Sequence, residues 1–64
     1  MCEANAYLIE GDETKLVMEG VDVVEPEEGG PRLINIFGDQ KFVKARIYSL
    51  SLVDHKVFLK HERV

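Results

Sequence analysis

The chain has 64 residues and a mass of 7.3 kDa, which corresponds to one small domain spanning residues 1–64. A protein of this size buries only about 60% of the surface that its unfolded chain exposes, and it rarely encloses a water-excluding pocket, so the length argues against an enzyme. The composition, with 45% hydrophobic and 31% charged residues and a net charge of −4, is typical of a globular rather than a disordered protein.

The apolar runs and the cysteine count narrow the class of protein further. No apolar run comes near the roughly 20 residues that a membrane-spanning helix needs. No signal-peptide pattern follows Met1. The single cysteine cannot form a disulfide within the chain, and with two histidines it cannot complete a zinc site. We therefore expect a cytoplasmic protein that makes no contact with a membrane.

Turn-forming residues recur at short intervals, and the segments between them are rich in Val, Ile, Leu, Phe and Tyr, which favours strands over helices. In residues 2–9, apolar and polar side chains alternate, which predicts Ala4, Ala6 and Leu8 on one face. Gly20 is expected to mark a bend or bulge, and Pro26 to end a strand because it lacks an N–H group. The expected strands span residues 2–9, 14–18, 21–25, 32–37, 40–44, 46–53 and 56–60.

These segments predict an all-β fold, a small antiparallel barrel or rolled sheet of six to seven short strands. Apolar side chains occur on both faces of several strands, for example Ile47 and Val53 against Tyr48 and Leu50. A small barrel has only one interior, so the second apolar set needs cover from another chain. We therefore expect a homodimer, which also enlarges the core of a marginal domain.

Charge is distributed unevenly along the chain. Residues 1–30 contain nine acids and one base, whereas residues 31–64 contain seven bases and three acids. One interpretation is that the two halves neutralise each other on adjacent strands. The alternative is an RNA-binding module in which Lys41, Lys44 and Arg46 contact phosphates and Tyr48 stacks on a base. The acidic overall pI of about 5.0 opposes this alternative.

Cys2 is the candidate metal ligand. Methionine aminopeptidases remove Met1 when the next residue is small, which leaves a free α-amine beside the Cys2 thiol. Both groups titrate near neutral pH and together form a five-membered N,S chelate suited to nickel(II), copper or zinc. In a dimer, a second copy supplies a second thiolate. The alternative is that Cys2 packs as a small apolar residue at the start of a strand.

Several segments of the chain resemble the CooT family. They are the Met1-Cys2 start, residues 21–24 (Val-Asp-Val-Val), residues 34–40 (Ile-Asn-Ile-Phe-Gly-Asp-Gln), residues 44–47 (Lys-Ala-Arg-Ile) and residues 52–59 (Leu-Val-Asp-His-Lys-Val-Phe-Leu). The resemblance extends over nearly the whole chain, although its motifs are short and mostly hydrophobic.

The resemblance implies a small all-β homodimer that is not an enzyme and that binds nickel(II) through the cysteine after the initiator methionine, here Cys2. It also implies a metallochaperone-like role in supplying nickel to a client such as carbon monoxide dehydrogenase. Relatives of this shape are labelled predicted RNA-binding proteins as well, and fold likeness alone does not establish that activity. A third possibility is an interaction domain that binds no metal.

Overall fold

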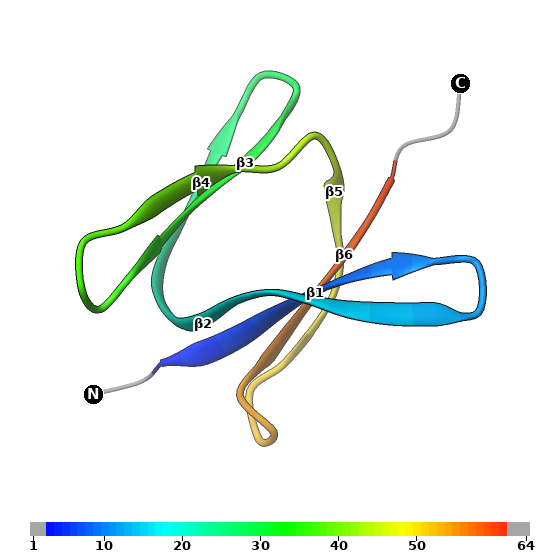
Figure 1. The fold of residues 1–64 in the computed structure, drawn as a ribbon, viewed down its shortest axis with the longest axis horizontal. Coiled ribbons are helices and arrows are strands. Elements are labelled where there is room, and N and C mark those ends of the chain that lie inside the picture. Colours follow the sequence, from blue (N-terminus) through cyan, green and yellow to red (C-terminus); the bar gives the residue numbers. More distant parts are fainter. Residues whose placement is uncertain (1–2, 62–64) are drawn as a thin grey trace.

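The computed structural model describes residues 3–61, so the Met1-Cys2 start lies outside the described residues. Figure 1 shows a single rolled sheet with no helix covering it. No helix in the described part of the chain is long and apolar enough to span a membrane. The strands are β1 (Ala4–Glu10), β2 (Glu13–Glu27), β3 (Gly30–Asn35), β4 (Gln40–Phe42), β5 (Arg46–Ser51) and β6 (Lys56–Lys60).

The strand order is β4-β3-β2-β1-β6-β5, with β1 and β6 running parallel and every other pair antiparallel. The all-β prediction is confirmed, but the prediction of an antiparallel sheet is wrong at the β1–β6 pair. The β5–β6 hairpin is the last hairpin in the sequence. Its strand β6 pairs with β1 and runs in the same direction as β1. This pairing places the first and last strands of the chain side by side within the sheet.

A bend in the long strand β2 rolls the sheet. The first half of β2 pairs with β1 and its second half pairs with β3, and the register shifts at three places. At each shift β2 has one residue more than its partner, which bends the bulged strand. Gly20 lies at this bend with φ of 65°, and its carbonyl accepts a hydrogen bond from the Ile36 N–H at 2.9 Å. The two strands predicted on either side of Gly20 are therefore one bent strand.

The prediction that Pro26 ends a strand is also wrong, because β2 continues to Glu27. Pro26 lies directly opposite Pro31 of β3. Neither residue has an N–H group, so both tolerate a position of the ladder where no hydrogen bond is exchanged. The segment predicted as the main loop is correspondingly short, with a turn at Glu28 and Gly29.

The concave side of the roll holds the core. It consists of small and medium-sized residues, with Leu33 and Leu59 as the largest fully buried side chains. Ala6 is buried, and Ala4 and Leu8 pack against the core, so the predicted facing of the first strand is confirmed. The buried set is Ala6, Val21, Leu33, Ala45, Val57 and Leu59.

The roll is not closed into a barrel, because β4 and β5 are edge strands that do not pair with each other. Residues 43–45 connect them across the open side. The Val43 N–H donates a hydrogen bond to the Pro31 carbonyl at 3.0 Å, and Ala45 is buried. This link passes so close to Gly30 that a Cβ there would overlap the Val43 carbonyl oxygen.

We expect Gly30→Ala to lower the free energy of unfolding by at least about 2 kcal/mol, because the Val43 backbone has to move away from the new methyl group. The control is Gly11→Ala, where φ is also positive but no other group lies within 4 Å. That variant costs only about 1 kcal/mol through its left-handed backbone. Urea unfolding of both variants measures the difference, and equal costs contradict the close approach.

Candidate functional site

The parallel β1–β6 pair places the start of β1 beside the β5–β6 turn. Asn5 lies opposite Lys56, and the Asn5 N–H donates a hydrogen bond to the His55 carbonyl at 3.0 Å. Glu3, the residue that follows Cys2 in the sequence, therefore lies next to a turn that is more than 45 residues away along the chain. This end of the molecule is the candidate functional site.

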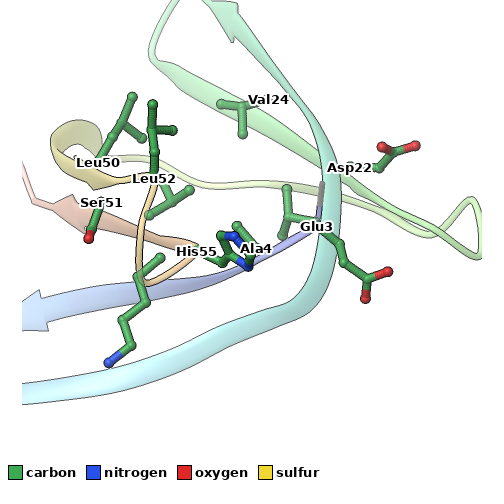
Figure 2. Close-up of a pocket in the computed structure, with 11 residues that line it drawn as sticks. Glu3, Ala4, Asp22, Val24, Leu50, Ser51, Leu52 and His55 are labelled. Carbon is green, nitrogen blue, oxygen red and sulfur yellow. The ribbon is translucent and has the colours of Figure 1, made fainter. Parts of the chain in front are cut away.

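A hollow of about 300 Å³ lies at this end, between the start of β1, the middle of β2 and the β5–β6 hairpin. Figure 2 shows Leu50, Leu52 and Val24 on its apolar side, with Glu3 and Asp22 at its rim. Leu50 is half-exposed, and Leu52 has 82% of its surface exposed. The hollow is therefore an open apolar surface with two carboxylates beside it.

His55 supplies the imidazole among the side chains that line this hollow. Its side chain lies beside Ala4 in Figure 2, and the residue lines the hollow. Its φ of 56° is the one positive value at a non-glycine residue among residues 3–61. Because the left-handed conformation is unfavourable for a residue with a Cβ, the tight turn holds His55 in a strained backbone.

Cys2, the predicted metal ligand, lies outside the described residues. Its neighbour Glu3 lines both the hollow described above and a second one formed with Gly20, Ile36 and Phe37. Within residues 3–61, no three His, Cys, Asp or Glu side chains are grouped as a metal site. The prediction for Cys2 is therefore not tested by the described geometry.

The four residues predicted for RNA binding do not form one cluster. Arg46 and Tyr48 share β5, as predicted. Lys41 lies on β4 at the opposite edge of the sheet, and its ammonium group is 3.5 Å from the Val17 carbonyl oxygen. Lys44 lies in the link between β4 and β5, where its carbonyl is 3.3 Å from Nδ1 of His61.

Lys60 is the residue that sequence reasoning missed. It lies directly opposite Arg46, and its ammonium group is 4.9 Å from the centroid of the Tyr48 ring. Pairing of residues 46–51 with residues 56–60 through a short turn could have located this neighbour from the sequence, since the register of a hairpin follows from its turn.

A further polar cluster lies at the far end of β1. Hydrogen bonds from Lys15 and His61, each 3.1 Å from a carboxylate oxygen of Glu10, lower the pKa of that carboxyl group. Arg32 similarly lowers the pKa of Glu27 at 2.8 Å. All of these groups are solvent-exposed, so they contribute little to stability.

Comparison with known proteins identifies the family. A profile described as CO dehydrogenase accessory protein CooT matches residues 1–60. The chain belongs to the CooT family. The resemblance predicted from the sequence motifs is thereby confirmed, and the CooT profile covers the Met1-Cys2 start as well as the six strands.

Two further proteins are similar to this chain. A crystal structure of a protein assigned to CooT from Carboxydothermus hydrogenoformans is 47% identical, covers 97% of this chain and 100% of that one, and superposes with a TM-score of 0.90. An uncharacterized protein of Methanothermobacter thermautotrophicus is 34% identical over 62 residues, which is 97% of this chain and 92% of that protein. The open six-stranded roll is therefore the architecture of this CooT chain.

The strain at His55 leads to a stability prediction. We expect His55→Gly to raise the free energy of unfolding by up to about 1 kcal/mol, because glycine adopts the left-handed conformation without a Cβ penalty. His55→Val, whose β-branched side chain is least compatible with this conformation, lowers it. Urea unfolding distinguishes the two variants, and a loss of stability in His55→Gly as large as that in His55→Val contradicts the backbone strain.

Proposed function

We propose that this protein is a nickel(II)-binding accessory protein for carbon monoxide dehydrogenase, metallochaperone-like in its role, that carries one metal ion per homodimer through Cys2 of each chain. The observation that carries the proposal is the match to the CO dehydrogenase accessory family over residues 1–60, which takes in Cys2. An accessory protein of a metalloenzyme needs a ligand that can hold the cargo and release it.

The chemistry of the N-terminus supports nickel as the cargo. Removal of Met1 leaves an amine and a thiol on the same residue, and two copies provide two nitrogens and two sulfurs. Such a donor set favours planar four-coordination of nickel(II), whereas zinc prefers a tetrahedral arrangement. Few ligands per chain and an open site favour transfer over permanent storage.

The exposed apolar side chains support the homodimer. Leu52 and Val53 at the β5–β6 turn are 82% and 91% exposed, and Phe37 is 81% exposed. Leu52 lines one of the two hollows that contain Glu3, and Phe37 lines the other. A second copy that covers these side chains also brings the Glu3 residues of the two chains toward each other.

The two carboxylates at the rim of the hollow favour the approach of a metal ion. Glu3 and Asp22 lie beside the apolar hollow, and unlike Glu10 and Glu27 they have no ion pair within residues 3–61. Their negative charge raises the local concentration of a divalent metal ion before it reaches the thiolates.

Metal titration of the untagged protein, with removal of Met1 verified by mass spectrometry, tests the nickel site. We expect one nickel(II) per two chains and a sulfur-to-nickel charge-transfer absorption band. Both disappear in Cys2→Ser. The matched control is His61→Gln, which removes an exposed imidazole at the far end of β1 and leaves the stoichiometry unchanged. Nickel binding that survives in Cys2→Ser contradicts the proposal.

Sedimentation velocity tests the homodimer at the predicted surface. Leu52→Asp places an unpaired charge in the proposed interface, so we expect the dissociation constant to rise by at least about 10-fold. The control is Leu16→Asp, a half-exposed apolar residue of β2 that contributes to neither hollow. A wild-type protein that is monomeric at micromolar concentration excludes this dimer.

A further inference from the structure

The outer face of β5, β6 and β1 carries aromatic side chains next to lysine and arginine side chains. Val57 and Leu59 of β6 point into the core, so the alternate residues Lys56, Phe58 and Lys60 project from the opposite face. The register adds one neighbour on each side, because Tyr7 of β1 lies opposite Phe58 and Arg46 of β5 lies opposite Lys60. We call this surface the aromatic face, made of Tyr7, Arg46, Tyr48, Lys56, Phe58 and Lys60.

The rings on this face are ordered by contacts with each other and with lysines. The Tyr7 and Phe58 rings stack with centroids 5.7 Å apart and an interplanar angle of 26°. The ammonium group of Lys56 lies 5.9 Å from the Tyr7 centroid, and that of Lys60 lies 4.9 Å from the Tyr48 centroid. Two of the three rings therefore already have a cation above them.

Tyr48 is the most accessible of the three rings. It is the extra residue at a register shift between Ile47 and Ser49, where β5 bulges away from β6. Its side chain is 56% exposed, whereas Tyr7 and Phe58 are half-buried. The bulge presents one phenol ring to solvent beside two cations.

The charge of the face is not neutralised within the described chain. Over residues 3–61 the ion pairs join Glu10 to Lys15 and His61, and Glu27 to Arg32, so none involves Arg46, Lys56 or Lys60. Like charges directly opposite each other on paired strands are destabilising. An anion bound between Arg46 and Lys60 relieves that repulsion.

We propose that the aromatic face binds a single-stranded nucleic acid, with phosphates between Arg46 and Lys60 and an unpaired base stacked on Tyr48. Exposed rings interleaved with cations are the combination that single strands recognise, because every base has a π-face and every linkage carries a charge. Three strands spaced about 4.8 Å apart give a surface about 10 Å wide, which accommodates only a few nucleotides. The acidic remainder of the chain limits the affinity, and none of the six residues of the aromatic face is a ligand in the proposed nickel site.

Fluorescence anisotropy tests the proposal, with labelled oligouridine, oligothymidine and a duplex of about 12 nucleotides or base pairs at about 50 mM salt. We expect binding of at least one single strand and weaker binding of the duplex. The logarithm of the binding constant should fall with the logarithm of salt concentration with a slope of about −1.4, since Arg46 and Lys60 each contribute about −0.7.

Three variants locate the site. Tyr48→Ala is expected to weaken binding by about 5- to 150-fold, the loss of one stacked base, while Tyr48→Phe keeps the ring and the affinity. Lys60→Gln weakens binding and makes the salt slope shallower by about 0.7. The matched control is Lys41→Gln on β4, which leaves binding unchanged. Circular dichroism verifies that each variant is folded.

The opposite results overturn the proposal. They are no binding of either single strand at about 50 mM salt, a duplex bound as tightly as the single strands, or an equal loss in Lys41→Gln and Lys60→Gln. The Cys2→Ser variant should retain the affinity of the wild type. Failure of this site and failure of the nickel site are therefore observed separately.

Discussion

The parallel pairing of β1 and β6 is the constraint on which the rest of the structure depends. It brings the first described residues of the chain next to the β5–β6 turn, and so creates the hollow beside Glu3. It also aligns Tyr7 with Phe58 on the opposite face of the same two strands. One backbone ladder therefore supports both the surface proposed for dimerisation beside the metal site and the surface proposed for nucleic-acid binding. The two strands of this parallel pair are far apart in the sequence, so forming the pair carries a large entropic cost, which only tertiary packing offsets.

The bend at Gly20 makes that packing possible. A chain of 64 residues has too few apolar side chains to fill two layers, and a single flat sheet would leave its core side in water. Because β2 has extra residues at three register shifts, its two halves turn toward each other and enclose Leu33 and Leu59. The enclosed volume is small, which explains why residues such as Leu52 and Val53 remain outside it.

Local sequence patterns predicted the strands better than their partners. The facing of Ala6 and Leu8 follows from a two-residue period, and the Gly20 bend follows from the preference of glycine for positive φ. The parallel direction of β6 depends on pairing with a distant segment, which a single sequence does not encode locally. The continuation of β2 through Pro26 depends on the register of the β2–β3 hairpin, which sets Pro26 opposite Pro31. The same limit applies to the candidate sites. Cys2 was predicted from its chemistry together with the resemblance to the CooT family and stays a prediction, whereas the contact between Lys60 and Tyr48 required the register of the β5–β6 hairpin.

The two edges of the open roll have a consequence for solubility. An uncovered strand edge is a template on which further chains can add, and a roll with two such edges could grow into fibres. Here β4 has only three residues, and β5 is interrupted by the bulge at Tyr48, so neither edge offers a long regular row of hydrogen-bonding groups. Self-association is thereby directed away from the edges and toward side-chain surfaces, where a two-fold arrangement stops after the second copy.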